Sequence, residues 1–309
     1  MLNRTGKRST RPADPGIRAC MSDVLFDQAA GLRKLLARGA LRTLTVASAE
    51  RGSGRSLIAA SLAVALARQG QEVVLLDCGT DDQRAAKLLG AEPASDWLAS
   101  TRRRFGTADA TAEGCAGVRV MRADLMLDWL PRLSEKEAGQ LSESFANLHP
   151  GAGMLVIDAP VGDLVLAAAA RELLLVVGPD PDAITSSYRY LKRLRAEGGA
   201  GFVEVVVNRA QSAPHADKIF GNLSSTSRRF LSLPLELMGR IPQDDRLARA
   251  LRLRQPVMDV FPQAPGAMAL QQCVANLLRW PNTGEDGLAA FTSRLLEMGR
   301  GMRAGPSGR

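Results

Sequence analysis

The sequence predicts an α/β fold in which a doubly wound, mostly parallel sheet is flanked by helices. Short apolar runs alternate along the chain with longer segments of helical spacing. Several of these runs are apolar at consecutive positions, which is typical of strands covered by helices on both faces. Aromatic residues make up only 4% of the 309 residues, whereas Ala, Leu and Val are abundant. This composition favours helices packed on buried strands over an aromatic-rich β-sandwich.

The expected elements follow one another in a regular order. A helix is expected over residues 24–37, where apolar residues have helical spacing and Gly39 provides a stop. A strand at Leu44–Ala47 then leads through the loop Ala49–Ser53 into a helix at Gly54–Gln69. Further strands are expected at Val73–Leu76, Met154–Ile157, Leu173–Val177 and Val203–Val207. Residues 91–150 are less regular; we assign them no chemistry and interpret their basic cluster, Arg102–Arg104, as a solvated surface.

Three of the predicted strands are followed by a polar residue. These residues are Asp77, Asp158 and Asn208. Functional groups in open α/β sheets gather at the carboxyl ends of the strands, so we expect all three near the loop at 48–56. The two carboxylates could order Mg²⁺ or its water shell, and the amide could contact a nucleotide base.

The loop after the first strand has the residue types that bind phosphate. Gly52 and Gly54 let backbone N–H groups approach an anion, and the loop leads into a helix N-terminus. Arg55 offers a positive charge and Ser56 offers a hydroxyl group for Mg²⁺. Taken alone, the loop could also be an ordinary glycine and serine turn.

The order of these motifs resembles the MinD/ParA branch of the SIMIBI P-loop NTPases over roughly residues 40–280. The resemblance implies a bound ATP or ADP with Mg²⁺ and an ATP-dependent homodimer. The stretches that carry it are Val74–Asp77, Leu88–Gly90, Val156–Pro160, Pro179–Thr185, Val207–Arg209 and Gly239–Asp244. The nucleotide contacts that it implies are Gly52, Ser53, Gly54, Arg55, Ser56, Asn208, Pro242 and Asp244, and the metal ligands are Ser56, Asp77 and Asp158.

The loop departs from the pattern of active relatives at three positions. Those relatives have lysine where this chain has Glu50 and Arg55, and aspartate where it has Gly79. Arginine does not replace lysine at a tight site, and a carboxylate beside phosphate is repulsive. Without the aspartate, no side chain at this position can orient the attacking water. We therefore expect weak nucleotide binding and little or no ATP hydrolysis.

A segment before the NTPase domain resembles the activator motif of the FlhG/FleN family of flagellar number regulators. It is the run Asp27–Arg33, within a helix expected over 21–40. In that family, the helix docks on the GTPase FlhF and stimulates GTP hydrolysis. The resemblance implies that Gln28 acts at the partner's active site and that Asp27, Leu32 and Arg33 shape the contact. The alternative is an amphipathic helix that packs on its own domain.

The C-terminal segment 281–309 is expected to form a helix at Gly287–Met302 and a tail. One helical face carries apolar residues and the opposite face carries Arg294, Glu297 and Arg300. The apolar residues are Leu288, Phe291, Leu295, Met298 and Met302. This pattern resembles the membrane-targeting helix of MinD and FlhG, which lies on anionic lipid. A terminal helix packed on the domain is the alternative.

The bulk composition limits the other possibilities. The net charge is +8, but much of the excess lies in the two ends, including a basic head at 1–20 that we expect to be disordered. We therefore expect no specific nucleic-acid partner, although a ParA-type DNA-partitioning protein remains the less favoured alternative. The four cysteines are scattered, and neither a signal peptide nor a membrane span is expected.

These observations predict a cytoplasmic protein that associates peripherally with a membrane. The favoured function is regulation of flagellar number or placement by stimulation of an FlhF-type GTPase. A flagellar transcription regulator is a further candidate partner. An active, membrane-cycling ATPase of the MinD type is the alternative.

Overall fold

The computed structural model describes residues 41–79, 84–99, 110–146, 153–199, 201–253, 255–279 and 288–304. All of them belong to one compact unit that spans Ala40–Arg309. The basic head, the helix expected at 21–40 with Asp27, Gln28, Leu32 and Arg33, and the cluster Arg102–Arg104 lie outside the described residues.

An eight-stranded sheet forms the centre of this unit, in the order β3-β4-β2-β5-β1-β6-β7-β8. Neighbouring strands are parallel, except that β3 runs antiparallel to β4 at one edge. The mostly parallel α/β sheet predicted from the sequence is therefore confirmed. The strands are β1 (Arg42–Ala47), β2 (Val73–Asp77), β3 (Thr111–Glu113), β4 (Arg119–Arg122), β5 (Met154–Asp158), β6 (Glu172–Val177), β7 (Phe202–Ala210) and β8 (Leu235–Pro242).

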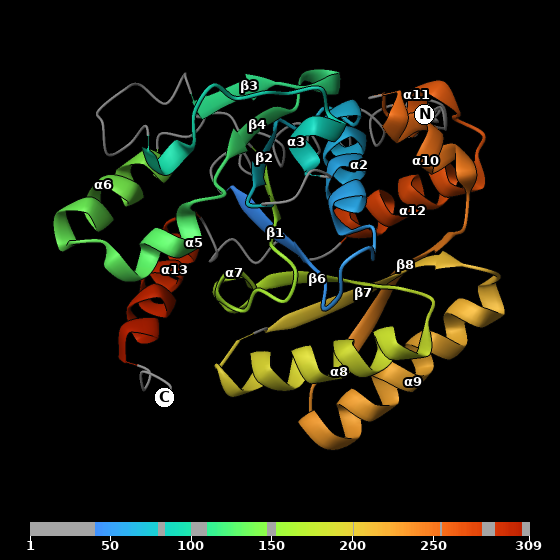
Figure 1. Cartoon of the computed structure of the whole chain (residues 1–309). Coiled ribbons are helices and arrows are strands. Elements are labelled where there is room, and N and C mark those ends of the chain that lie inside the picture. Colours follow the sequence, from blue (N-terminus) through green and yellow to red (C-terminus); the bar gives the residue numbers. More distant parts are fainter. Residues whose placement is uncertain are drawn as a thin grey trace, which may run out of the picture. The chain divides into compact units, whose positions relative to one another are not determined.

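Helices cover both faces of the sheet (Figure 1). One apolar core joins the sheet to α2 (Arg55–Arg68), α3 (Ala85–Leu88), α10 (Asp245–Arg252), α11 (Val257–Val260) and α12 (Pro265–Arg279). A second core joins the opposite face to α5 (Met126–Trp129), the 3-10 turn η3 (Leu130–Arg132), α6 (Glu135–Ala146), α7 (Val165–Ala169), α8 (Pro181–Ala196), α9 (Ala213–Leu231) and α13 (Leu288–Ala304).

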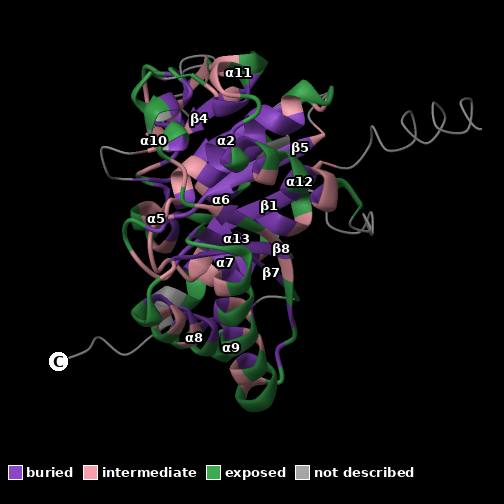
Figure 2. Ribbon diagram, turned by 90° about the vertical axis from the view of Figure 1, so that its right-hand side faces the viewer, coloured by how far each residue is buried: buried purple, intermediate pink, exposed green. Residues whose placement is uncertain are grey.

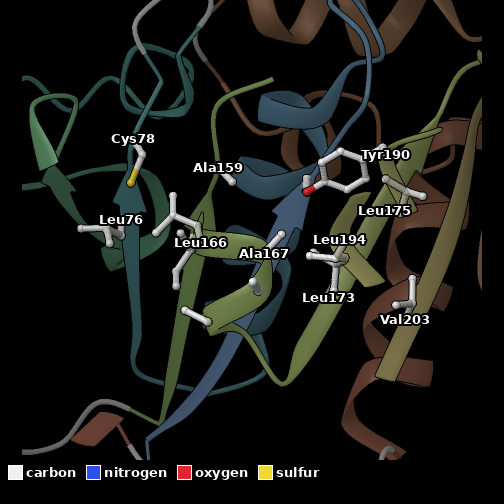
Figure 3. Close-up of a cluster of buried hydrophobic side chains, with 14 of the residues drawn as sticks. Leu76, Cys78, Ala159, Leu166, Ala167, Leu173, Leu175, Tyr190, Leu194 and Val203 are labelled. Atoms are coloured by element: carbon white, nitrogen blue, oxygen red, sulfur yellow. The ribbon is translucent and has the colours of Figure 1, made fainter. Parts of the chain in front are cut away.

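The burial pattern of the central strands explains their continuous apolar runs. Every residue of β1, β2 and β5 is buried, because helices cover both faces. Figure 2 shows β1 and β5 inside the molecule, between helices whose outer faces are exposed. Figure 3 shows one of the two cores, where Leu173 and Val203 of the sheet lie with Tyr190 and Leu194 of α8.

The strand register brings the predicted polar residues together. Asp77, at the end of β2, is the direct partner of Asp158, at the end of β5. Val46 of β1 is the partner of Asp158 on its other side. The two carboxylates therefore lie side by side next to the loop that leaves β1, as the sequence predicts.

The described part of 91–150 contains a sheet edge that the sequence did not predict. Residues 119–122 form β4, in which the flanking Arg119 and Arg122 are half-buried and the middle pair is buried. Strands of this length show no long apolar run, so the periodicity is too weak to detect. Trp97 is fully buried beside them and donates a hydrogen bond from Nε1 to Ser144 Oγ over 2.7 Å.

The C-terminal helix α13 packs on the domain. Its residues Phe291 and Leu295 are fully buried. Arg294 Nε donates to the carbonyl oxygen of Ala169 at the end of α7 over 2.7 Å. Gly299 lies against η3, where an added Cβ would come 3.0 Å from Leu130 Cβ. Phe291 and Leu295, which the sequence assigns to a membrane surface, are thus covered by the domain. The described helices include none long and apolar enough to span a membrane.

Candidate functional site

The loop from Ser48 to Gly54 connects β1 to α2 and has the bent backbone of an anion-binding turn. Gly52 and Gly54 have φ of 72° and 85°, a left-handed conformation that glycine adopts without strain. Gly54 is the N-cap of α2 and makes no side-chain cap. The first N–H groups of the helix therefore have no intrahelical acceptor and face the loop, which is the arrangement that favours a bound anion.

Asn208 holds this loop from the end of β7. Its Nδ2 donates to the carbonyl oxygen of Ser53 over 2.7 Å, and its Oδ1 accepts from Arg209 N over 3.0 Å. A Cβ on Gly54 would lie 2.3 Å from Asn208 Nδ2, so only glycine fits there. The buried amide thus positions the loop, whereas the sequence suggested that it reads a base.

Arg55, the first residue of α2, turns beneath the loop. Its Nε donates to Asp158 Oδ1 over 2.5 Å, and its Nη2 donates to Ser56 Oγ over 3.0 Å. Arg55 is only 4% exposed and Asp158 is 0% exposed, so this is a buried ion pair. The guanidinium group therefore contacts two of the three residues that the sequence assigns to a magnesium ion.

Asp77, the third of these residues, holds the chain that follows β2. Its Oδ1 accepts from Gly79 N over 3.0 Å, and its Oδ2 accepts from Ala86 N over 2.8 Å. Burial and the neighbouring Asp158 carboxylate raise the pKa of Asp77 from 3.8 to about 6. The two carboxylates thus lie side by side where water does not reach, and Arg55 is paired with Asp158.

Gly79 lies close to the guanidinium group of Arg55. A Cβ at position 79 would stand 3.8 Å from Arg55 Nη2 and 3.1 Å from Asp77 Oδ1. Two of the three departures noted in the sequence, Arg55 and Gly79, therefore meet in space. Sequence patterns alone do not show this contact, because 24 positions separate the two residues.

Pro242 is the last residue of β8, and Asp244 follows it. Both lie at the carboxyl end of an edge strand of the sheet. Asp244 Oδ1 accepts from Arg246 N over 3.0 Å at the start of α10. Its Oδ2 accepts from Gly266 N over 3.0 Å in the first turn of α12. Asp244 therefore joins two helices, and its contact with a nucleotide stays a prediction.

Asp163 is a buried acid that the sequence reading missed. Its carboxylate accepts from Leu166 N over 2.8 Å and from Val165 N over 3.3 Å at the start of α7. Tyr190 OH donates to its carbonyl oxygen over 2.7 Å. Burial raises the pKa of Asp163 to about 6. These contacts fix the turn after β5, and Gly162 N in this turn donates to Ser48 O over 2.9 Å.

The residues fit a nucleotide phosphate and a metal ion unequally. The left-handed glycines and the uncapped helix start suit phosphate. A magnesium ion requires oxygen ligands, but Ser56 Oγ and Asp158 Oδ1 each accept a hydrogen bond from Arg55. No group of three or more His, Cys, Asp and Glu side chains in the described segments is arranged to hold a metal ion.

Comparison with known proteins now places the chain. A model of the CobQ/CobB/MinD/ParA nucleotide binding domain matches residues 44–257. The chain belongs to this family. Within it, the chain is similar to the antiactivator FleN of Pseudomonas aeruginosa, with 29% identity over 78% of this chain and 88% of the relative.

Solved structures show the same fold. The MinC:MinD cell division complex of Aquifex aeolicus matches with a TM-score of 0.61 and 21% identity over 78% of this chain and 96% of that chain. The septum site-determining protein MinD of Pyrococcus horikoshii, solved with Mg-ADP, has a TM-score of 0.58 and 18% identity over 77% and 96% of the two chains. The P-loop NTPase fold that the sequence predicted is confirmed.

Proposed function

We propose that this chain is a flagellar number regulator of the FleN type, which acts through contacts with other proteins and does not turn over ATP at a useful rate. Its MinD/ParA domain serves as the scaffold, and the helix at 21–40 presents Gln28 to an FlhF-type GTPase. The similarity to the antiactivator FleN, over 88% of that protein, supports the flagellar role. A flagellar transcription regulator is the second partner that this relationship suggests.

The observation that carries the loss of ATP turnover is the buried contact of Arg55 with Asp158. Phosphoryl transfer depends on positioning and on positive charge placed against the phosphates. The guanidinium group of Arg55 is instead directed at a carboxylate, at 2.5 Å. Gly79 provides no side chain that could orient water. ATP is therefore a structural ligand at most, and we expect any ATP-dependent dimer to be weak.

Association of α13 with a membrane requires this helix to detach from the domain. The buried Phe291 and Leu295 would need to exchange their protein contacts for lipid. We propose that the described packing is the resting state of this helix. The peripheral membrane role then depends on an event that releases it, such as partner binding.

GTP turnover by an FlhF-type GTPase tests the proposal. The full chain should raise this turnover, and Gln28→Ala should remove the stimulation while the protein stays folded. Gln271→Ala is the matched control, because Gln271 is an exposed glutamine on α12 of the same chain. Stimulation that survives Gln28→Ala, or a lack of stimulation by the intact chain, would refute the GTPase-activating role.

A further inference from the structure

The Arg55 guanidinium group makes the contacts that a metal ion would need. Its Nε and Nη2 donate to Asp158 and Ser56, at 2.5 Å and 3.0 Å. Both acceptors are oxygen atoms of the kind that magnesium prefers. Asp158 Oδ1 and Ser56 Oγ are therefore already held by a cation that belongs to the chain.

We infer that Arg55 is the resident cation of this site and excludes the divalent metal ion, so that the loop takes phosphate ligands independently of magnesium. This inference rests on the proposed function, in which the domain is a scaffold without ATP turnover. It goes further, because a loop that hydrolyses slowly can still require Mg²⁺ for binding.

Burial makes the arrangement difficult to reverse. The side chains of Arg55 and Asp158 are 4% and 0% exposed, so a metal ion could bind Asp158 Oδ1 only by displacing the guanidinium group. The displaced arginine would then need another buried anion, because an unpaired charge is strongly disfavoured away from water. Asp77 and Asp163 offer little alternative, since each carboxylate already accepts two backbone N–H groups.

The position of Gly79 supports the same inference. A Cβ at this position would lie 3.8 Å from Arg55 Nη2, so a longer side chain would compete with the guanidinium group for space. A glycine at this position therefore leaves room beside Nη2 for the guanidinium group.

The charges of the site agree with a cation that the chain itself supplies. Asp77 and Asp158 are register neighbours, and Arg55 lies against the second of them. The guanidinium group supplies part of the counter-charge that a divalent ion would otherwise bring. Nucleotide phosphates would then meet the backbone N–H groups of the loop and the start of α2, which need no metal to act as donors.

The experiment measures the unfolding temperature of the full chain with ADP, in the presence of Mg²⁺ or of EDTA, against matched samples without nucleotide. For the wild type, the two ADP conditions should agree within about 1 °C after subtraction of the samples without nucleotide. Arg55→Lys should be about 3 °C more stable with Mg²⁺ than with EDTA, the shift expected for a tenfold gain in affinity. Arg55→Lys combined with Gly79→Asp should keep or increase this difference.

Arg68→Lys is the matched control, because it makes the same substitution at the other end of α2, where the side chain is 44% exposed. It should behave as the wild type does. The electron paramagnetic resonance signal of Mn²⁺ gives an independent readout: the wild-type chain with ADP should quench it no more than ADP alone, and Arg55→Lys with ADP should quench it further.

A wild-type chain that is stabilised by Mg²⁺ with ADP, or that binds Mn²⁺ with ADP, would overturn the inference. If Arg55→Lys and its combination with Gly79→Asp both fold but gain no response to metal, the exclusion is not due to Arg55. Neither result depends on GTP turnover by a second protein, so failure here is distinguishable from failure of the proposed function.

Discussion

Arg55 and Asp158 form a buried ion pair beneath the loop between β1 and α2, with 2.5 Å between Nε and Oδ1. The arginine comes from the start of a helix and the aspartate from the end of a central strand. The pair therefore joins the loop, α2 and the sheet at one point.

Removing one partner of this pair should destabilise the domain more than removing both. Arg55→Met leaves Asp158 buried without its cation, a change that typically costs about 3–5 kcal/mol. Combining it with Asp158→Leu removes the isolated charge, so the double variant should be more stable than Arg55→Met. Urea unfolding of the four proteins in this mutant cycle provides the test. A double variant less stable than both single variants would contradict the account.

Glu204 should make stability depend on pH. It is 2% exposed in the middle of β7, and burial together with Glu236 and Glu172 raises its pKa from 4.5 to about 8. Above pH 4.5 the unfolded chain loses a proton from Glu204 that the folded state retains. The contribution of Glu204 to the free energy of unfolding is therefore full below pH 4.5, and it is lost as the pH rises through 8.

Glu204→Gln removes this ionisable group. The variant should gain stability relative to wild type between pH 5 and pH 8, on the order of 3 kcal/mol. Denaturant unfolding across this range measures the difference between the two proteins. Glu236→Gln should give a smaller gain, because Glu236 is the exposed register partner on β8 and accounts for only part of the shift. Parallel stability curves for Glu204→Gln and wild type would count against the shifted pKa.

Gly54→Ala should distort the loop in a way that Gly52→Ala does not. Both glycines have left-handed φ, so alanine is strained by about 1 kcal/mol at either position. Only at Gly54 would the added Cβ also collide with Asn208 Nδ2, at 2.3 Å. Gly54→Ala should therefore cost at least about 1 kcal/mol more than Gly52→Ala, and Asn208→Ala should recover part of the excess. Equal unfolding free energies for the two glycine variants would exclude the proposed clash.

Gly299→Val should loosen the C-terminal helix. A Cβ at Gly299 would lie 3.0 Å from Leu130 Cβ, and the branched side chain adds two methyl groups beyond it. Faster hydrogen exchange of α13 and stronger sedimentation with anionic vesicles are the expected results, because Phe291 and Leu295 become available to lipid. Gly301→Val is the control, since nothing lies within 4 Å of a Cβ at Gly301. Vesicle binding by the wild type equal to that of Gly299→Val would show that the packed helix does not restrain the membrane-bound state.

The sequence predicted the central sheet because its strands are buried on both faces and read as continuous apolar runs. It also predicted that Asp77 and Asp158 lie together, because parallel strands end at the same edge. The strands β3 and β4 escaped detection because each has only three or four residues and carries no such run. Helical spacing placed α13 but could not decide whether its apolar face meets lipid or protein.

The chemistry of the site was less predictable than its location. An arginine at the start of a helix can point outward to an anion or inward to a carboxylate. The sequence is the same in both cases, so it does not distinguish the two orientations. The structure shows the inward contact with Asp158, together with a glycine at position 79 beside it. Similarly, the amide of Asn208 faces the carbonyl oxygen of Ser53, a tertiary contact across 155 positions that no local pattern indicates.

The most direct test of whether this domain is a scaffold or an active ATPase is phosphate release from ATP by the purified full chain. The assay contains Mg²⁺ and anionic vesicles. The account predicts that the wild type is no faster than Arg55→Ala, because the guanidinium group is paired with Asp158 and does not face the phosphates. A clear ATP turnover by the wild type that Arg55→Ala abolishes would contradict it.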